Sequence, residues 1–433
     1  MGTDAILIDG SCTADKKVLD KVKDLGIKYL FTRFVGYNNI DLNAAKADGI
    51  MVANVPSYSP YSVAELALTM GMDLFRHVAQ ATVNTNNADF RVLPTYYSNE
   101  IHDATVGIIG VGHMGSAEAK LYHNLGANVL GYQRHPNDNP DVTFVNEDEL
   151  LEKSDIVSLH VPYVPGKNDE MIGGPELAKM KRNAILVNTA RGELVDTNAI
   201  TIALSGSNIG GYAADVIIDE NQIDGNEFNS LDDLPNKDVL ELMKRYPNVI
   251  ITPHIGYLTK PATIDMIKEL IKYTPSAFNG QTVRAVVLFD ENHDKLWDIV
   301  EDALREKVPA NGFLRTKAKI STFRDAYASI LFFTDMDKVK ELQGQFKTYQ
   351  YEMYNWSEEG QGNAQFAVWT GLEENGLGVN IQHYDPLINA QVASTFDIPD
   401  NWQLRAEMNF GSVNTPAGKK DFMDDSKRFK EFK

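Results

Sequence analysis

Three polar residues with complementary chemistry follow apolar runs in the middle of the chain. Arg191 lies in NTARGELVD, Glu220 in ADVIIDENQ and His254 in ITPHIG. Reduction of a 2-keto acid needs a cation for the carboxylate, a proton donor for the carbonyl oxygen and an anchor for that donor. Arg191 can supply the first, His254 the second, and Glu220 can hold His254 and raise its pKa. Singly, each residue has an ordinary structural explanation. Together, and downstream of a dinucleotide motif, they predict an acid–base site.

The dinucleotide motif is TVGIIGVGHMGSAEA, in which Gly110, Gly112 and Gly115 have the G-x-G-x-x-G spacing. It follows an apolar strand pattern and opens a helical one, which is the context that the motif requires. Gly110 permits a tight turn, Gly112 lets the backbone approach a pyrophosphate at the helix N-terminus, and Gly115 permits close helix–strand packing. His113 and Met114, between these glycines, belong to the same predicted site.

The choice between NAD and NADP depends on the end of the next strand. An acidic residue is expected there to hold the adenosine ribose, but NVLGYQRHPN has Gln133 followed by Arg134. Without a carboxylate a 2′-phosphate is not repelled, and Arg134 can pair with it. The alternative is that Gln133 serves the ribose and Arg134 is solvated. The sequence supports both hypotheses equally.

Short apolar strand patterns alternate with helical patterns through the first 260 residues, which predicts a doubly wound parallel sheet. A helix over 15–26 is expected to place Val18, Leu19, Val22 and Leu25 on one face, and a second, long helix is expected over 61–81. We expect strands at residues 5–10, 28–33, 50–55, 105–110, 128–132, 155–161, 184–190, 210–216 and 248–254, and further helices at 113–126 and 196–206.

The pattern changes after about Pro261, where aromatic residues become more frequent and no second dinucleotide motif occurs. Residues 259–274 predict one amphipathic helix, through Ile264, Ile267, Leu270 and Ile271. We therefore expect a partial substrate domain at 1–58, a dinucleotide-binding domain at 59–260 and a further α+β domain at 261–433. In that last domain we expect strands at 282–290 and 328–333 and helices at 293–308 and 362–378.

Composition excludes several classes of function. The 433 residues carry a net charge of −19, which disfavours nucleic-acid and anionic-membrane partners. A single cysteine suits a reducing compartment, and neither a secretory signal nor an apolar run long enough to span a bilayer occurs. We expect a cytoplasmic protein with a small-molecule substrate and no bound metal.

Six motifs together resemble the D-isomer-specific 2-hydroxyacid dehydrogenases, in particular the D-lactate dehydrogenases. They are TRFVGYNNID, NVPSYSPYSVAE, GIIGVGHMG, SLHVP, NTARGELVD and TPHIG, within residues 3–265. The resemblance implies that Arg191, Glu220 and His254 are catalytic and that NAD or NADP is the cofactor. It further implies substrate contacts from Val35, Gly36 and Tyr58, and cofactor contacts from His160, Val161, Pro162, Thr189, Ala190 and Asp215.

Two features of that family have no counterpart in this sequence. Family members carry about two β-α units before the strand that here begins at Ala5, and they end with a helix and tail that complete the substrate domain. The expected substrate domain is therefore a truncated flavodoxin-like sheet with an exposed edge.

The turn PSAFNGQ places Ser276, Asn279 and Gln281 between a helix and a strand, and Gln382 follows in GLGVNIQHYDP. Amide side chains can donate to and accept from an isoalloxazine ring, although such residues are usually ordinary turn residues. These stretches, with LWDIVEDAL and MNFGS, resemble the FMN-dependent nitroreductases over about residues 264–433. The resemblance implies a homodimer with FMN at its interface. The family's N-terminal Arg-Arg-Ser/Thr motif for the FMN phosphate does not precede Ile264.

Three functions remain open at this stage. The first is an NAD(P)-dependent oxidoreductase that interconverts a pyruvate-like 2-keto acid and a D-2-hydroxy acid, fused to a nitroreductase-like segment. The second is an FMN-dependent NAD(P)H nitroreductase-type enzyme. The third is a non-catalytic NAD(P)-binding or dimerising protein. The complete Arg191, Glu220 and His254 set favours the first.

Overall fold

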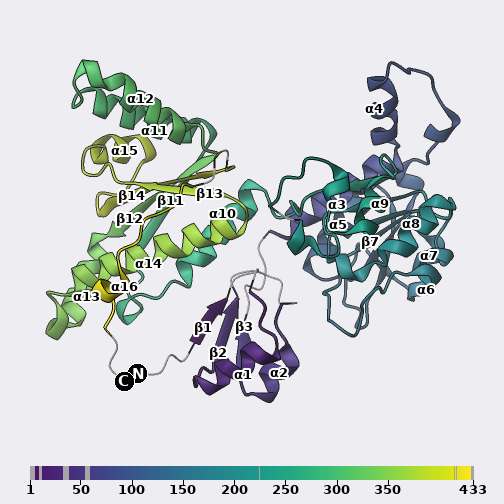
Figure 1. Cartoon of the computed structure of the whole chain (residues 1–433), viewed down its shortest axis with the longest axis horizontal. Helices are drawn as coiled ribbons and strands as arrows, with labels where there is room; N and C mark the ends of the chain where they lie inside the picture. Colours follow the sequence, from purple (N-terminus) through teal and green to yellow (C-terminus); the bar gives the residue numbers. More distant parts are fainter. Residues whose placement is uncertain are drawn as a thin grey trace. The chain divides into compact units, whose positions relative to one another are not determined.

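The computed structural model describes residues 5–8, 12–32, 39–53, 59–223, 225–413, 415 and 417–430. The chain divides into two compact units, Met1–Met266 and Ile267–Lys433, so the division falls inside helix α10 (Lys260–Lys272). Figure 1 shows the helices and strands of the two units.

The first unit begins with a small parallel sheet in the order β1-β2-β3, formed by Ala5–Ile8, Tyr29–Thr32 and Met51–Ala53. Helices α1 (Lys16–Asp24) and α2 (Leu42–Ala47) connect these strands. Asp15 and Asp41 begin the two helices, because each carboxylate accepts a bond from a backbone N–H of the first turn.

Helix α1 buries a narrower face than its pattern predicts. Leu19 and Val22 are buried, but Val18 is 39% exposed and Leu25, beyond the end of the helix, is 70% exposed. Of the four residues expected on one face, two are therefore buried, and Leu25 lies just beyond the helix.

The rest of the first unit is a seven-stranded parallel sheet in the order β10-β9-β8-β7-β4-β5-β6. The strand order reverses between β4 and β7, which is where open α/β sheets bind ligands at their carboxyl edge. The strands are β4 (Thr105–Ile109), β5 (Asn128–Tyr132), β6 (Thr143–Phe144), β7 (Ile156–Leu159), β8 (Ile185–Asn188), β9 (Gly211–Ala214) and β10 (Val249–Ile251).

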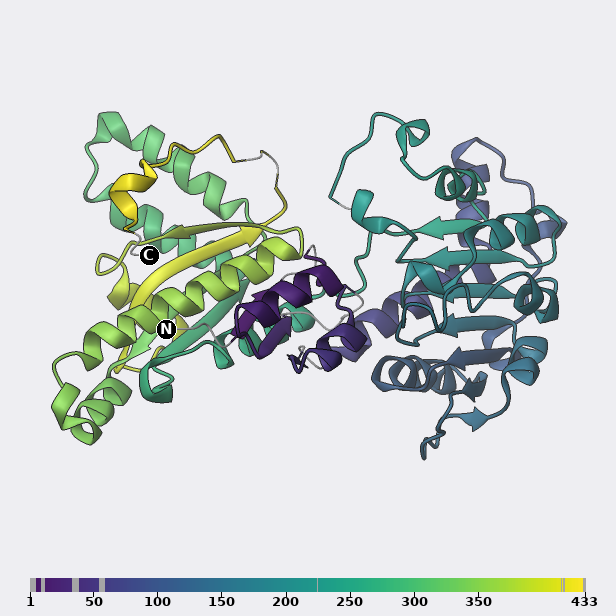
Figure 2. The same cartoon turned by 60° about the horizontal axis from the view of Figure 1, so that its bottom comes forward.

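Helices cover both faces of this sheet, and Figure 2 shows the strands stacked between them. One face packs on α3 (Pro60–Phe75) and α5 (His113–Asn124). The other packs on α6 (Glu147–Lys153), α7 (Gly174–Lys179), α8 (Thr197–Ser205) and α9 (Lys237–Met243). Two buried apolar clusters fill these layers, as expected when strands are apolar on both sides.

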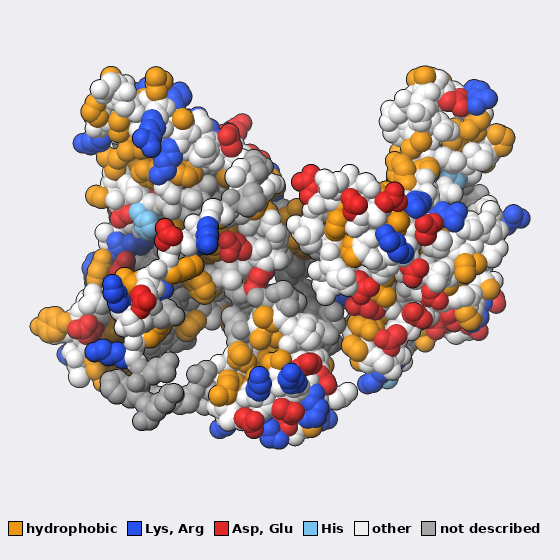
Figure 3. Space-filling view, in the orientation of Figure 1, with side chains coloured by type: hydrophobic (Ala, Val, Ile, Leu, Met, Phe, Trp, Pro, Cys, Tyr) orange, Lys and Arg blue, Asp and Glu red, His pale blue; other side chains and the backbone are white. Residues whose placement is uncertain are grey.

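The single long helix expected over 61–81 is instead two helices. Helix α3 ends at Phe75, and α4 (Val78–Asn86) begins after His77, which has a left-handed φ of 54°. Apolar periodicity continues through the break, so the pattern cannot reveal it. Helix α4 starts an arm that carries exposed apolar side chains (Figures 1 and 3). They are Val78, Phe90, Val92 and Tyr97.

The second unit contains a four-stranded antiparallel sheet in the order β11-β12-β14-β13. The strands are β11 (Val283–Phe289), β12 (Ala328–Asp335), β13 (Gly378–Gln382) and β14 (Trp402–Gly411). The helices are α11 (Asp290–Arg305), α12 (Ala310–Arg324), α13 (Met336–Gln345), α14 (Met353–Glu374), α15 (Asn389–Phe396) and α16 (Asp425–Arg428).

Helix α14 crosses one face of this sheet, and α11, α12 and α15 lie over the other (Figure 1). The core between the sheet and α11 contains Trp297, Leu331 and Phe333. Within the same unit, Leu270 of α10 packs on α14, because a Cβ at Gly371 would lie 2.5 Å from the Leu270 Cδ1 atom. The predicted fold class, a parallel α/β sheet followed by an α+β domain, is confirmed.

Leu331→Ala should destabilise the second unit selectively. Leu331 is fully buried in the central strand β12, so its truncation should cost about 2–5 kcal/mol. All four tryptophans (297, 356, 369 and 402) lie in this unit, so tryptophan fluorescence during urea unfolding reports on it alone. Leu314→Ala, at an 80% exposed position of α12, is the matched control. Equal unfolding midpoints for the two variants would contradict the assigned core.

Candidate active site

The three predicted acid–base residues follow three neighbouring parallel strands. Arg191 comes three residues after β8, Glu220 follows β9 and His254 follows β10, in a sheet where β8, β9 and β10 are adjacent. Parallel strands place their carboxyl ends at one edge. The structure therefore brings this sequence-predicted set to one edge of the sheet.

A close backbone approach holds the first two loops together. A Cβ at Gly192 would lie 2.1 Å from the carbonyl carbon of Ile217 and 2.4 Å from the nitrogen of Ile218. No side chain fits at that distance, so only glycine allows the Arg191 loop to contact the segment that leads to Glu220.

Asp215 ties the His254 loop to the end of β9. Its buried carboxylate accepts bonds from the Thr252 hydroxyl at 2.5 Å, from the Ile255 N–H at 2.9 Å and from the Gly256 N–H at 2.7 Å. The His254 N–H donates to the Asp215 carbonyl at 3.0 Å, while His254 itself has a left-handed φ of 51°. The resemblance implied a nicotinamide contact for Asp215, and in the structure both of its carboxylate oxygens are used within this loop.

His254 and Glu220 form the acid–base pair of the edge. The His254 Nδ1 atom lies 3.4 Å from Glu220 Oε1, with the two side chains 34% and 28% exposed. Burial by itself lowers the pKa of His254, but the hydrogen bond and the negative charge of Glu220 outweigh it, so the pKa is raised above its ordinary value. The second Glu220 oxygen, Oε2, is buried without a hydrogen-bond partner.

Arg191 extends from a loop whose backbone is held by hydrogen bonds. The Asn188 side chain donates to the Arg191 carbonyl at 2.8 Å and accepts from the Ala190 N–H at 3.0 Å. The Arg191 Nη1 atom donates to the Ala190 carbonyl. Beside it, burial followed by the charge of Glu220 raises the pKa of Glu193, against the opposing effects of its own backbone bond and of Arg191.

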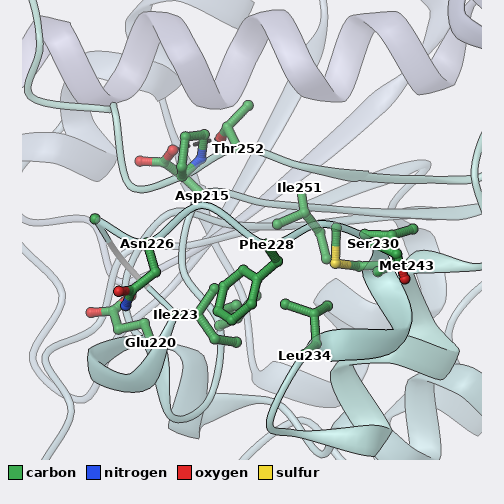
Figure 4. A pocket seen from close by; sticks show the side chains of 14 residues that line it. Asp215, Glu220, Ile223, Asn226, Phe228, Ser230, Leu234, Met243, Ile251 and Thr252 are labelled. Carbon is green, nitrogen blue, oxygen red and sulfur yellow. Dashed lines mark hydrogen bonds between the residues drawn. The ribbon is translucent and has the colours of Figure 1, made fainter. Parts of the chain in front are cut away.

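A cavity of about 360 Å³ adjoins Glu220 and Asp215 (Figure 4). Figure 4 shows Glu220 and Asn226 at one end and the rings and chains of Phe228, Ile223 and Leu234 in the middle. The Glu220 side chain, 28% exposed, thus lies at a polar end of a cavity whose middle is apolar.

The glycine-rich turn lies at the point where the strand order reverses. Gly110 has a φ of 96°, and a Cβ at Gly115 would lie 2.1 Å from the Gly110 oxygen, so the first turn of α5 rests directly on the strand end. Gly112 begins α5, and a Cβ there would meet nothing within 4 Å. His113 and Met114 form the first helical positions. The backbone at this helix N-terminus is thus open to an anion such as a pyrophosphate.

The remaining predicted cofactor residues occupy different positions around that edge. Gln133 and Arg134 follow β5, and the Gln133 amide donates to the His135 carbonyl at 2.8 Å. Thr189 and Ala190 follow β8, and the Thr189 hydroxyl is buried without a partner. His160, Val161 and Pro162 directly follow β7. The three predicted substrate residues, Val35, Gly36 and Tyr58, lie outside the described residues.

The His160 side chain does not face the nucleotide edge. It is 1% exposed and bonds through Nε2 to Oε2 of the buried Glu118 in α5 at 2.6 Å. Any contact of this residue with a dinucleotide therefore comes from its backbone.

In the second unit, Ser276 organises the predicted flavin turn. Its hydroxyl accepts from the Gln281 N–H at 3.1 Å, and it precedes the short 3-10 helix Ala277–Asn279. Phe278, Asn279 and Gln281 all have left-handed φ values of 48–54°. Such strain in non-glycine residues is concentrated at functional sites.

The flavin candidates are not gathered within one copy of the chain. The Ser276 turn leads into β11, whereas Gln382 ends β13, and these two strands form opposite edges of the sheet. Gln382 pairs across the strands with Glu407, whose carboxylate accepts from the Tyr384 N–H at 3.0 Å. Burial raises the pKa of Glu407 to about 8.

Sequence reasoning missed several polar residues near these sites. Glu118 lies in TVGIIGVGHMGSAEA and Glu193 in NTARGELVD, and neither was predicted as a site residue; Glu407 lies in β14. For Glu118 a signal existed, because Gly115 and Tyr122, three residues before and four residues after it, share its helix face and are not charged. Glu193 and Glu407 have no comparable signal.

Family models match residues 68–412 in two adjoining pieces. Residues 68–256 match the NAD-binding domain of the D-isomer specific 2-hydroxyacid dehydrogenases, and residues 257–412 match the nitroreductase family. Among the described residues, no helix combines the length and apolar character that a membrane span needs, and no cluster of three or more His, Cys, Asp or Glu side chains could hold a metal ion.

Individual relatives cover the first part of the chain. A 2-hydroxyacid dehydrogenase homolog of Zymomonas mobilis is 40% identical over 285 residues, which are 64% of this chain and 84% of that protein. A D-lactate dehydrogenase of Lactobacillus delbrueckii is 34% identical over 61% of this chain and 80% of its own length. The structure of a Lactobacillus jensenii D-lactate dehydrogenase with NAD+ aligns with a TM-score of 0.52 at 39% identity, covering 61% of this chain and 80% of that one.

Glu220→Gln should lower the pKa of His254. The substitution removes the negative charge that raises this pKa and leaves the burial that lowers it. The titration of the His254 ring protons, followed by NMR and assigned with His254→Asn, measures the shift. Glu241→Gln, an exposed change on α9, is the control. An unchanged or higher His254 pKa in Glu220→Gln would refute the pairing.

Proposed function

Because the chain belongs to the family of D-isomer specific 2-hydroxyacid dehydrogenases, we propose that Arg191, Glu220 and His254 perform the reversible reduction of a pyruvate-like 2-keto acid to a D-2-hydroxy acid. The observation that carries this proposal is the His254–Glu220 pair at the edge where the NAD-binding domain presents its strand ends. The residue roles, the substrate and the stereochemistry are parts of the proposal.

Each residue has a distinct task in the proposed reaction. The Arg191 guanidinium binds the substrate carboxylate and so orients the carbonyl group. A bound dihydronicotinamide supplies the hydride that C2 of the substrate accepts. The carbonyl oxygen takes its proton from the imidazolium of His254, and Glu220 stabilises that cation, so the hydroxy acid leaves a neutral histidine. In the reverse direction neutral His254 accepts the hydroxyl proton. Val35, Gly36 and Tyr58 are the proposed further substrate contacts.

The dinucleotide site fits NAD, and we propose that it also accepts NADP. Gly110, Gly112 and the N-terminus of α5 provide the open backbone for a pyrophosphate. The two residues directly after β5 are Gln133 and Arg134, so no carboxylate stands at the strand end to repel a 2′-phosphate, and Arg134 is exposed there. Thr189, Ala190 and the backbone of residues 160–162 complete the proposed contacts.

A second candidate function belongs to residues 257–412. The strained turn at Phe278, Asn279 and Gln281 supports a flavin site, in which Ser276 holds the turn and amide groups face the ring. Because Gln382 lies at the other sheet edge, a complete site requires a second copy of the chain. FMN reduction by NAD(P)H is therefore proposed only for a dimer. The proposed domain boundaries remain 1–58, 59–260 and 261–433.

We propose that the chain forms a homodimer in the cytoplasm. The arm that begins at α4 exposes Phe90, Val92 and Tyr97 at 77%, 90% and 86%, which is apolar surface suited to a protein partner. Light scattering should give about twice the chain mass of 48.2 kDa. Phe90→Ser and Val92→Ser should lower this mass toward that of one chain. A wild-type chain with the mass of a monomer would contradict the dimer, and a dimer mass unchanged in both variants would contradict the arm as its contact surface.

The decisive experiment follows oxidation of NADH and NADPH by the purified chain, first with pyruvate and then with a nitroarene. We expect pyruvate-dependent oxidation that yields D-lactate and falls by at least about 10³-fold in His254→Ala, the scale of a lost general acid. His102→Ala, at an exposed position, is the control.

The other outcomes separate the alternatives. Activity only on nitroarenes, with flavin absorption, would replace the proposal by the flavin enzyme. Nucleotide binding without either activity would indicate a non-catalytic NAD(P)-binding protein.

A further inference from the structure

The buried pair of Glu118 and His160 has no part in the chemistry at the sheet edge. Their side chains are 0% and 1% exposed, and the His160 Nε2 atom lies 2.6 Å from Glu118 Oε2. The Ser158 hydroxyl lies 3.3 Å from the same nitrogen. Burying a charged group costs free energy of folding unless the group is paired and hydrogen-bonded. An apolar pair of similar size would fill the same space.

This pair closes a ring of contacts around the glycine-rich turn. The backbone of His160 lies on one side of Gly110. A Cβ added to Gly110 would be 2.8 Å from both the carbon and the oxygen of the His160 carbonyl group. On the other side lies Gly115 of α5, at the 2.1 Å approach already described. Glu118 follows Gly115 by three residues on the same face of the helix, and its carboxylate is hydrogen-bonded to the His160 ring.

We infer that Glu118 is a positioning residue for the dinucleotide: by bonding to His160 it fixes the β7 end against Gly110 and sets the spacing of the pyrophosphate-binding turn. The pair joins α5, whose N-terminus presents free N–H groups, to the backbone of residues 160–162. The His160 N–H donates to the Ile109 carbonyl of β4 at 2.8 Å, so the β7 end is already held to β4, and the Glu118–His160 pair adds a side-chain link to α5. The inference concerns the cofactor site of the proposed function and depends on dinucleotide binding, not on the identity of the 2-keto acid.

Neighbouring atoms supply a matched control. Tyr122 lies one turn after Glu118 on α5, is fully buried, and its hydroxyl has no hydrogen-bond partner. Tyr122→Phe thus removes a buried oxygen from the same helix face without breaking the link to His160.

The test measures the Kd for NADH from the fluorescence of the nucleotide, without a keto acid present. Thermal unfolding of each variant is measured alongside to show that it is folded. Glu118→Leu should raise this Kd about tenfold, the effect of losing one strong hydrogen bond. Glu118→Gln, which keeps a hydrogen-bonding group, should restore most of the affinity. Tyr122→Phe should leave the Kd unchanged. In turnover, the KM for NADH should rise in Glu118→Leu while kcat at saturation stays within about twofold.

The double variant Glu118→Leu/His160→Leu covers the case in which a single variant does not fold. It leaves no unpaired buried charge, so it should fold, and its Kd should remain raised. A folded Glu118→Leu or double variant with the wild-type Kd would overturn the inference, as would an equal rise in Tyr122→Phe. Wild-type chain that binds NADH but reduces no keto acid would contradict the proposed function and leave this test intact.

Discussion

The candidate active site depends on one close backbone approach, between Gly192 and the segment Ile217–Ile218. This approach brings the loops after β8 and β9 to a spacing that no side chain permits. The Asp215 carboxylate then joins the loop after β10 through three hydrogen bonds. Arg191, Glu220 and His254 thus extend from three loops whose backbones are fixed before any substrate binds. Such preorganisation is what an acid–base site requires.

The electrostatics of the edge follow from that arrangement. Burial alone would make His254 a poor proton donor at neutral pH, and Glu220 reverses the effect through its bond and charge. Both side chains are only partly exposed, at 34% and 28%, so water screens their interaction less than it would at an open surface. Glu193, whose pKa is raised by burial and by Glu220, adds a further titrating carboxyl beside Arg191.

Much of this organisation could be predicted from local sequence, for particular physical reasons. Strand β5 occupies residues 128–132 as expected, because a short apolar run between turns has few alternatives. The order of motifs also predicted that the strand ends carry the polar set. The break at His77 could not be predicted, since apolar spacing continues across it. The inward orientation of the His160 ring could not be predicted either, because it depends on a hydrogen-bond partner 42 residues away in α5.

One amphipathic helix was expected over residues 259–274, between the stretches that resemble the two enzyme families, and the structure has one helix there, α10, over Lys260–Lys272. The two family matches adjoin just before it, at residues 256 and 257, while the division between the compact units falls at 266 and 267. Ile267 and Leu270 are buried as the pattern indicated, with Leu270 seated on Gly371 of α14. Ile264 and Ile271 are only half-buried.

The most direct test of the account is the kcat/KM for pyruvate with NADH in Gly192→Ala. The added methyl group must separate the Arg191 loop from Ile217, and a displacement of about 1 Å at such a site costs on the order of 100-fold in rate. Gly174→Ala, where the methyl group meets nothing within 4 Å, should match the wild type. We predict a loss of that order with NADH affinity retained. Wild-type activity in a folded Gly192→Ala variant would contradict the central claim that this approach assembles the active site.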